Sequence, residues 1–422
     1  MSEHSLLLET PPRGWTAESF GDLCIRVQDS ASPTPNGQRL YVGLEHLASG
    51  FPALVGRSSE SEVRSGKTAF RKGDVLFGKL RPYLRKSALV SEDGICSTDI
   101  LVFRASNKSL AEFLCLLTHS AEFVGHAKAT TSGVQHPRTS WASLREFKLH
   151  VPPLAEQRKI AAVLGLVQRA VEQQERLIAL TTELKKALLH KLFTEGLRGE
   201  PQKQTEIGPV PESWEQRPLE KAGEVVYGIQ AAVASNLKPV GTMILTNKNI
   251  TLDGKIILDK INYFELKTKR HHETVLQKGD LLFNWRSGSK EHVGKTAYFD
   301  LAGEFVHSSF ILRIRPSDEV TGRYLFYYLN FLRESGFFLK KQTFSVNAKF
   351  NKSAINELPT YLPGEEERRE VVDALDAVGK KLDALHSRKR LIEDLFRTLL
   401  HQLMTAQIRV HNLDLPELEI AQ

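Results

Sequence analysis

Residues 79–86 combine side chains that suit contact with nucleic acid. The run Lys79-Leu80-Arg81-Pro82-Tyr83-Leu84-Arg85-Lys86 holds four cations and one aromatic ring. Arginine can bind guanine O6 and N7 through two parallel hydrogen bonds, whereas lysine mainly neutralises phosphate. The run predicts a DNA-contact loop, and its candidate contacts are Lys79, Arg81, Tyr83, Arg85 and Lys86.

A second run with suitable groups is Thr131-Ser132-Gly133-Val134-Gln135-His136-Pro137-Arg138. Its amide, hydroxyl and basic groups match the donors and acceptors on base edges. We therefore add Gln135, His136 and Arg138 to the candidate DNA contacts.

Both runs have counterparts in the second half of the chain. Asn284-Trp285-Arg286-Ser287-Gly288-Ser289-Lys290 follows a strand-like segment as residues 79–86 do, and residues 343–350 correspond to residues 131–138. A solvated loop has a similar composition, so each run alone decides little, but repetition at matching places favours DNA contact. The candidates in the second half are Asn284, Arg286, Ser289, Lys290, Asn347 and Lys349.

Motifs for catalysis and for metal binding are poorly represented. The tripeptides Gly66-Lys67-Thr68 and Gly294-Lys295-Thr296 have serine where a phosphate-binding loop needs its first glycine. Asp253, Glu265 and Lys267 can be matched to a nuclease-like Mg²⁺ site, but such matches arise by chance among 50 acidic and 57 basic residues, and a solvated strand edge is the preferred interpretation. The tetrapeptide with which amino-methyltransferases hold a flipped base is absent from the sequence. We therefore expect no catalytic residue and no metal ligand set.

The composition favours a cytoplasmic protein with an anionic partner. The 422 residues carry 57 basic and 50 acidic side chains, a formal charge of +7. The excess is local, because residues 64–148 hold 14 basic against 7 acidic side chains. Cys24, Cys96 and Cys115 lack the spacing of a disulfide framework or a zinc site. The sequence shows neither a secretion signal nor an apolar run long enough to span a membrane.

The chain consists of two related halves. Trp15 recurs as Trp214, at an offset of 199 residues, and Lys72-Gly73-Asp74 recurs as Lys278-Gly279-Asp280, at an offset of 206. From Pro152 onward the offset stays at 211. Loops accept insertions, whereas a helix with a fixed contact face does not. Each half is thus a variable module followed by a module of fixed length.

The fixed-length modules show a heptad pattern that predicts two long helices. Apolar residues recur at alternating steps of four and three, as in a coiled-coil seam. Two ordinary amphipathic core helices are the alternative, which their length disfavours. The predicted helix-spacer and partner-binding positions are Ile160, Leu164, Val167, Val171, Ile178, Leu188 and Leu192 in the first half, and Val371, Leu375, Val378, Leu382, Ile392, Phe396 and Leu399 in the second.

The variable modules mix short strand-like runs with short helical patterns at 109–124 and 319–333, so the predicted fold class is α+β with a pseudo-twofold internal repeat. A linker of 13 residues is too short to return along a helix of about 60 Å, so the two helices are expected to pack antiparallel. The predicted parts are variable modules at 1–151 and 212–362, helical modules at 152–198 and 363–410, a linker at 199–211 and a tail at 411–422.

The sequence resembles the specificity (S) subunits of type I restriction-modification systems. The motifs that carry the resemblance are Pro152-Pro153-Leu154-Ala155-Glu156-Gln157-Arg158-Lys159-Ile160, the stretch Leu184–Leu192, the segment Thr205–Trp214, Lys72-Gly73-Asp74 and Leu80-Arg81-Pro82-Tyr83-Leu84. They cover nearly the whole chain. The second helical module departs from the pattern, with Glu365-Glu366-Glu367-Arg368-Arg369-Glu370-Val371 at the matching place.

The resemblance implies a non-catalytic subunit with two target-recognition domains that bind an asymmetric two-part DNA target. It also implies docking of two methyltransferase subunits on the helices and recruitment of restriction subunits. S-adenosylmethionine, ATP and Mg²⁺ would belong to those partners, and this chain would bind no cofactor itself. The alternatives from other classes are a Mg²⁺-dependent DNA nuclease that acts alone and a coiled-coil adaptor that does not contact DNA.

Overall fold

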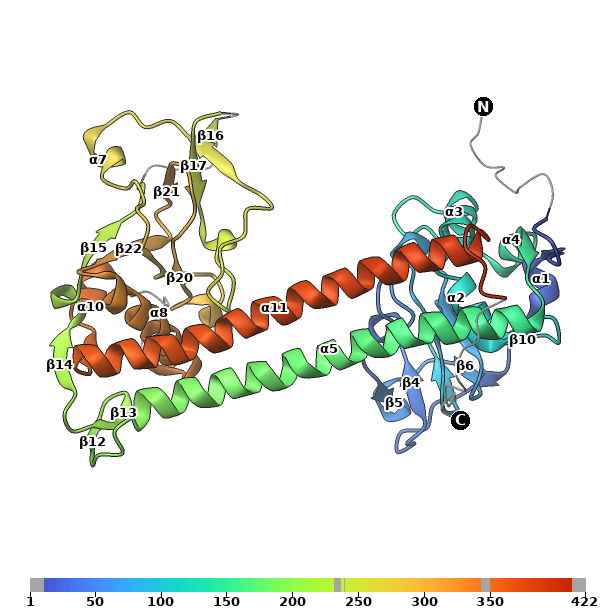
Figure 1. The fold of residues 1–422 in the computed structure, drawn as a ribbon, viewed down its shortest axis with the longest axis horizontal. Coiled ribbons are helices and arrows are strands. Elements are labelled where there is room, and N and C mark those ends of the chain that lie inside the picture. The colour runs from blue at the N-terminus through green and yellow to red at the C-terminus, as the bar shows by residue number, and fades with distance from the viewer. Residues whose placement is uncertain (1–10, 231–236, 239, 343–349, 412–422) are drawn as a thin grey trace. The chain divides into compact units, whose positions relative to one another are not determined.

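A computed structural model describes residues 11–230, 237–238, 240–342 and 350–411. The chain divides into two compact units (Figure 1). Unit 1 comprises Met1–Glu175 and Ser387–Gln422, and unit 2 comprises Arg176–His386. Two long helices, α5 (Leu154–Thr194) and α11 (Glu365–Met404), each contribute one part to either unit. Each unit therefore holds one variable module, called its recognition domain after the role predicted for it, together with the start of one long helix and the end of the other.

The recognition domain of unit 1 is built from short strands and helices. Its four-stranded sheet has the order β2-β10-β7-β8, and a five-stranded sheet has the order β3-β6-β9-β4-β5. The elements are β1 (Thr16–Ser19), α1 (Phe20–Leu23), β2 (Cys24–Val27), β3 (Ser30–Ala31), β4 (Leu40–Val42), η1 (Leu44–His46), β5 (Ser58–Ser59), η2 (Glu60–Glu62), β6 (Lys67–Phe70), β7 (Val75–Gly78), η3 (Pro82–Leu84), β8 (Ser87–Leu89), β9 (Gly94–Cys96), β10 (Ile100–Ala105), α2 (Ala111–Leu117), α3 (Ala121–Ala129), α4 (Trp141–Leu144) and β11 (Lys148–Val151).

The recognition domain of unit 2 repeats this plan with longer connections. Its two four-stranded sheets have the orders β15-β22-β19-β20 and β16-β18-β17-β21. The elements are β12 (Gln202–Thr205), β13 (Gly208–Pro211), β14 (Glu215–Pro218), η4 (Leu219–Lys221), β15 (Gly223–Tyr227), β16 (Leu237–Lys238), β17 (Thr242–Leu245), η5 (Asn247–Asn249), β18 (Asn262–Phe264), α7 (Lys269–His272), β19 (Leu281–Asn284), η6 (Lys290–His292), β20 (Thr296–Tyr298), β21 (Phe305–His307), β22 (Ile311–Pro316), α8 (Glu319–Glu334), α9 (Phe337–Gln342), α10 (Lys352–Asn356) and β23 (Pro359–Leu362).

Matching strands pair in matching ways in the two units. In unit 1, β10 pairs antiparallel with both β2 and β7, as β22 does with β15 and β19 in unit 2. One parallel pair also recurs, β4 with β9 in unit 1 and β17 with β21 in unit 2. The internal repeat predicted from the sequence is therefore a repeat of topology.

The repeated Lys-Gly-Asp motif has a structural role in each unit. Gly73 and Gly279 have φ angles of 87° and 95°, a left-handed conformation that glycine adopts at little cost. The next residue, Asp74 or Asp280, is buried and binds an arginine of the central strand. Nε of Arg104 and Nε of Arg315 each lie 2.8 Å from the Oδ1 atom of their aspartate. Through this aspartate–arginine pair, each motif links its tight turn to the central strand of the sheet, β10 in unit 1 and β22 in unit 2.

The two long helices run antiparallel within each unit. In unit 1 the first turn of α5 meets the segment that follows α11, where Glu156 Oε1 accepts a hydrogen bond of 2.6 Å from Arg409 Nε. In unit 2 the segment after α5 meets the first turns of α11. There the Leu197 amide donates to Glu367 Oε1 at 2.8 Å, and Arg198 Nη2 lies 3.0 Å from Glu370 Oε2. Each contact connects residues 170 or more positions apart in the sequence.

The predicted seam faces inward on both helices. Its most enclosed members are Ile160, Leu164, Val171, Leu192, Val371, Leu375 and Phe396, each at most 3% exposed, and Val167, Ile178, Leu188, Val378, Leu382, Ile392 and Leu399 are half-buried. In unit 1, Ile160 and Leu164 share a hydrophobic core with Phe396 of α11. The seam residues thus pack inside their own unit, as a helix spacer requires, and their role in binding a partner stays a prediction.

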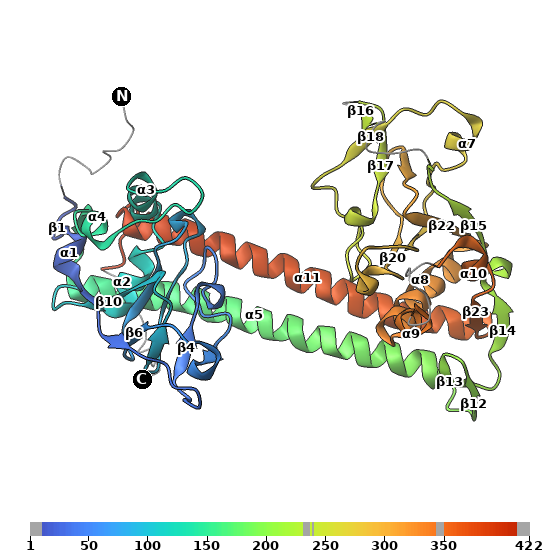
Figure 2. The ribbon, with the colours of Figure 1, turned by 180° about the vertical axis from the view of Figure 1, so that it is seen from behind.

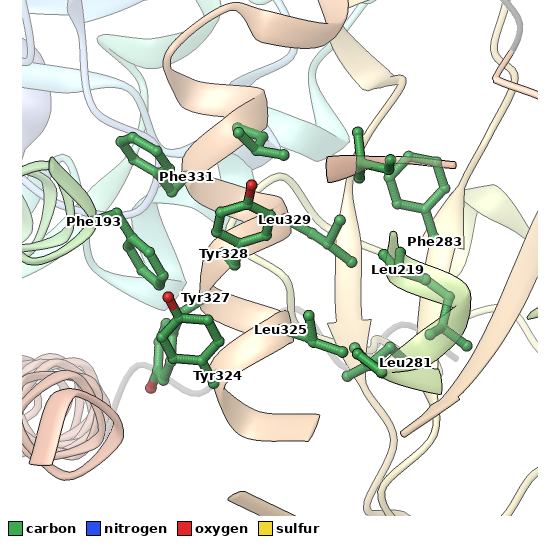
Figure 3. Close-up of a cluster of buried hydrophobic side chains, with 14 of the residues drawn as sticks. Phe193, Leu219, Leu281, Phe283, Tyr324, Leu325, Tyr327, Tyr328, Leu329 and Phe331 are labelled. Atoms are coloured by element: carbon green, nitrogen blue, oxygen red, sulfur yellow. The ribbon is translucent and has the colours of Figure 1, made fainter. Parts of the chain in front are cut away.

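The core of unit 2 contains aromatic residues from both the long helix and the recognition domain (Figure 3). The ring centroid of Phe193 on α5 lies 5.2 Å from those of Tyr324 and Phe331 on α8. The hydroxyls of Tyr324 and Tyr328 donate to the carbonyl oxygens of Tyr361 and Pro359 at 2.7 Å. The end of α5 thus packs with α8 and β23 in one hydrophobic core.

The structure confirms the predicted α+β class, the internal repeat and the antiparallel helix pair, and Figure 2 shows the same elements from behind. It differs in two places. The segment predicted as a linker forms a β-hairpin of β12 and β13, and Val210 of this hairpin is fully buried in the core of unit 2. The helical pattern at 109–124 forms two helices, α2 and α3. Among the described residues, no helix is long and apolar enough to cross a membrane.

Candidate nucleic-acid interface

The cationic run of unit 1 forms a tight loop between β7 and β8. Pro82–Leu84 forms the short helix η3, and the arginines on both sides of it, Arg81 and Arg85, have left-handed φ angles of 51° and 49°. Residues other than glycine adopt this conformation at a cost, and such positions cluster at binding sites. The Arg81 amide donates to the Pro137 carbonyl at 2.8 Å and the Arg85 amide to the Pro82 carbonyl at 2.9 Å, so hydrogen bonds fix the backbone at both arginines.

The structure joins the two predicted contact loops of unit 1. The Arg81 amide donates to the Pro137 carbonyl at 2.8 Å, and the Thr139 amide donates to the Lys79 carbonyl at 3.0 Å. Arg138 also forms a β-bridge with Leu80. Residues 79–86 and 131–138 therefore make a single surface although they are more than 40 positions apart in the sequence.

Candidates in this surface differ in exposure and in partners. Arg81, Gln135 and His136 are exposed, and Tyr83 is 48% exposed. Arg85 and Lys86 are half-buried, and Lys86 Nζ donates to the Leu44 carbonyl at 2.6 Å.

Arg138 is held by an acidic residue that sequence reasoning did not select. Its Nε and Nη2 donate to the two carboxylate oxygens of Asp99 at 2.9 and 3.2 Å. Lys79 Nζ lies 3.9 Å from the same carboxylate. The hydrogen bond from Arg138 lowers the pKa of Asp99 below its usual value, so this carboxylate stays charged at neutral pH.

The matching place in unit 2 is built on the same backbone with different side chains. The Trp285 amide donates to the Phe310 carbonyl at 3.3 Å, as the Lys79 amide donates to the backbone carbonyl of Asp99 at 2.9 Å. The guanidinium carbon of Arg286 lies 4.8 Å from the ring centroid of Trp285 and 4.4 Å from that of Phe310. Arg286 Nη2 also donates to Ser309 Oγ at 3.2 Å. Aromatic rings thus hold a cation where unit 1 uses a carboxylate.

One candidate in unit 2 needs correction. Asn284 is fully buried, and its Nδ2 donates to the His292 carbonyl at 2.7 Å. It occupies the last position of β19, so its side chain stabilises the following loop and has no exposed atom to offer DNA. Ser289 and Lys290 are exposed in that loop. Asn347 and Lys349 lie outside the described residues.

The tripeptides and acidic groups considered for catalysis have structural partners. Lys295 Nζ donates to the carbonyls of Asn247 and Ile250, and Lys67 Nζ donates to the Ser65 carbonyl, so both lysines brace loops of their own domains. Glu265 pairs with Lys267 at 3.2 Å on an exposed surface. Within the part of the chain that the structure describes, no group of three or more histidine, cysteine or carboxylate side chains could hold a metal ion.

Sequence reasoning missed Asp99 and Phe310, which lie next to the arginines in space and far from them in sequence. A signal for both exists, because the offset of 211 that relates the helical modules also relates position 99 to position 310. The two residues occupy equivalent positions just before β10 and β22.

The long helices expose a second candidate surface. Leu180 and Leu184 of α5 are each 56% exposed, and Leu391 and Leu395 of α11 are 69% and 49% exposed. The offset of 211 relates the first pair to the second. We call these pairs the leucine patches, one on the unit 2 part of α5 and one on the unit 1 part of α11.

Known proteins resemble the chain over most of its length. A family model described as the type I restriction modification DNA specificity domain matches residues 13–182 and 211–394. The type I restriction enzyme MjaVIII specificity subunit of Methanocaldococcus jannaschii is 21% identical over 431 residues, which cover 96% of this chain and 95% of the relative.

Two solved structures share the fold. A chain from work on complex assembly and conformational transition of the type I restriction-modification system superposes with a TM-score of 0.60 at 23% identity, over 94% of this chain and all of the other. The S subunit of the type I system from M. genitalium gives a TM-score of 0.56 at 14% identity, over 96% of this chain and 99% of the other.

Proposed function

Because the chain belongs to the type I restriction-modification DNA specificity family, we propose that it is the subunit that selects the DNA target of such a complex. It binds an asymmetric two-part duplex target, with one half-site for each recognition domain. It carries out no chemistry itself, and it acts in the cytoplasm, where it meets its DNA.

One observation carries the proposal. Asp99 and Phe310 occupy equivalent positions and accept the same backbone hydrogen bond, but they differ chemically, and each contacts an arginine from a different loop, Arg138 of residues 131–138 in unit 1 and Arg286 of residues 284–290 in unit 2. Base edges are distinguished by the side chains that reach them. Two loops with the same backbone hydrogen bonds and different side chains are suited to recognising two different half-site sequences.

The leucine patches support docking of two methyltransferase subunits. Exposed leucine pairs four residues apart lie on one helix face and offer an apolar contact to a partner. The patches match each other through the repeat, which suits two copies of one partner. The match is incomplete, because Leu177, 45% exposed beside the first patch, corresponds to Arg388 beside the second. S-adenosylmethionine, ATP and Mg²⁺ then belong to methyltransferase and restriction subunits.

The DNA-binding proposal is tested by replacing Lys79 and Arg81 with alanine in the complex of this chain and its methyltransferase. Each lost phosphate contact lowers the slope of log K against log salt by about 0.9. We expect weaker binding with footprint loss at the first half-site only. Equal loss at both half-sites contradicts the assignment of unit 1 to one half-site. Wild-type binding whose affinity depends neither on DNA sequence nor on salt concentration contradicts the proposed function.

The docking proposal is tested by replacing Leu180 and Leu184 with alanine, and separately Leu391 and Leu395. Burial of a leucine is worth about 1.5–3 kcal/mol, so each double variant should lose one methyltransferase copy. The molecular mass of the complex in solution measures this loss. Leu258→Ala, at an exposed leucine outside the helices (42% exposed), is the control. Unchanged stoichiometry in both double variants contradicts these patches as docking sites.

A further inference from the structure

Asp99 and Arg138 are arranged so that one edge of the guanidinium is fixed and the other is free. The carboxylate takes Nε–H and one N–H of Nη2, at 2.9 and 3.2 Å. A guanidinium has five N–H groups in one plane, so a fork made by Nη1 and the second N–H of Nη2 remains on the far edge. The side chain of Arg138 is 42% exposed, and its remaining contact is a long one of 3.5 Å from Nη1 to the His136 carbonyl.

The backbone that carries Arg138 is fixed as well. Its amide and carbonyl exchange hydrogen bonds of 2.9 Å with Ser132, which closes the loop 132–138 on itself. The adjacent Thr139 is bonded to Lys79 of the other loop. An arginine fixed at both its backbone and its guanidinium loses little conformational entropy when it binds, which favours affinity and selectivity.

The fold does not require a carboxylate at this place. Phe310 takes the equivalent position in unit 2, where the same backbone hydrogen bond forms without it. The Asp99–Arg138 pair is partly exposed, with 27% and 42% of the two side chains accessible, and ion pairs near the surface add little to stability. Neither folding nor stability therefore explains why an acidic side chain lies inside a surface that is otherwise cationic.

Resting on the proposed function, we propose that Arg138 reads a guanine in the first half-site through its free fork, and that Asp99 is the positioning residue that directs the fork. The geometry that binds guanine O6 and N7 is a planar pair of parallel N–H donors, which is what the free edge of Arg138 provides. Lys79, 3.9 Å from Asp99, then serves the neighbouring phosphate. Removal of the carboxylate should relax base preference at one position, whereas removal of Arg138 should abolish it.

The first experiment selects bound duplexes from a library with randomised half-sites, using the complex of the full chain with its methyltransferase. Wild type should select guanine at one position of the first half-site. Arg138→Ala should lose that preference, and Asp99→Asn should weaken it while the second half-site stays unchanged. Glu92→Gln, which breaks the exposed Arg57–Glu92 pair of 3.0 Å elsewhere in unit 1, is the matched control and should select as wild type does.

The second experiment replaces the selected guanine by 7-deazaguanine, which lacks the N7 acceptor. A bidentate pair is worth about 1–3 kcal/mol, or about 5- to 150-fold in affinity. Because O6 keeps its hydrogen bond, wild type should lose only part of this affinity, and Arg138→Ala should show no further loss on the modified DNA. Asp99→Asn should show an intermediate loss at unchanged thermal stability.

The outcomes separate this inference from the function on which it rests. If wild type selects a two-part target but Arg138→Ala and Asp99→Asn select the same bases, the inference is wrong and the function stands. If Asp99→Asn lowers thermal stability and affinity for every sequence equally, Asp99 is merely structural and the inference is again wrong. If wild type selects no sequence at all, the proposed function itself fails.

Discussion

The two recognition domains hold their loop arginines by opposite means. In unit 1, Asp99 binds Arg138 through charge and hydrogen bonds, and in unit 2 Arg286 lies between the rings of Trp285 and Phe310. The strands below the loops pair in the same register, since Gly78 faces Ile100 as Asn284 faces Ile311. The frame is thus common to both units, and the chemistry at its edge is specific to each.

This division suits a protein whose target can change while its fold stays the same. Buried features such as the Asp74–Arg104 and Asp280–Arg315 pairs have the same geometry in the two units, down to distances of 2.8 Å. Features at the loop surface differ. A change of side chain at position 99 or 310 leaves the hydrogen bond from Lys79 or Trp285 intact, because the backbone carbonyl of position 99 or 310 accepts it.

The largest effect should come from breaking the shared frame. Asp74→Ala or Asp280→Ala removes the buried carboxylate that binds a partly exposed arginine of the central strand, which costs about 3 kcal/mol. Because the geometry is the same, the two variants should destabilise their own units by similar amounts, as measured by urea unfolding with limited proteolysis to identify the unit that opens. A large loss in one unit and none in the other would show that the frames are not equivalent.

A somewhat smaller effect should follow from acid, since the described residues of each unit include one buried neutral histidine, His119 in unit 1 and His307 in unit 2. Burial lowers the pKa of His119 and of His307 to about 4. The unfolded chain takes up these protons near pH 6.5 and the folded chain does not, so stability falls as pH decreases from about 6.5 to 4. The difference corresponds to at most about 3 kcal/mol for each histidine.

Substitution of one histidine at a time tests the acid sensitivity of each unit separately. His119→Gln should remove the acid sensitivity of unit 1 and leave that of unit 2, and His307→Gln should do the reverse. Urea unfolding between pH 4.5 and 7.5 measures both. If the two variants remain as acid-sensitive as wild type, other groups dominate the pH dependence of stability.

The smallest effect should come from the aromatic contact in unit 2. Phe310→Ala removes one of the two rings against Arg286, and a cation–π contact at a partly exposed site is worth about 0.5–2 kcal/mol. We expect a loss of about 2- to 30-fold in affinity for the second half-site and none for the first, measured on duplexes that carry one half-site altered. Phe310→Tyr, which keeps the ring, should bind as wild type does.

The sequence predicted those features that repeat or that have a strict period. The helical seam is visible because the same face recurs at every third or fourth residue, and the burial of Ile160, Leu164 and Phe396 agrees with it. The contact loops of unit 1 were predicted from composition, and the structure brings them together. Their role in DNA binding stays a prediction.

What the sequence did not reveal depends on long-range contacts. Asn284 resembles an exposed loop residue, but β19 extends through it and the sheet buries its side chain. Asp99 lies 39 residues from Arg138 in a segment without any local signal. The hairpin of β12 and β13 has the proline and glycine content of a linker, and it is ordered because Val210 packs into the core of unit 2.

The central claim is that the two units read separate half-sites, and selection from a duplex library with both half-sites randomised tests it most directly. The complex of this chain with its methyltransferase should select a two-part sequence. Arg138→Ala should change base preference at one end only, and Arg286→Ala at the other end only. A selected sequence without two parts, or a change at both ends with either variant, would contradict the account.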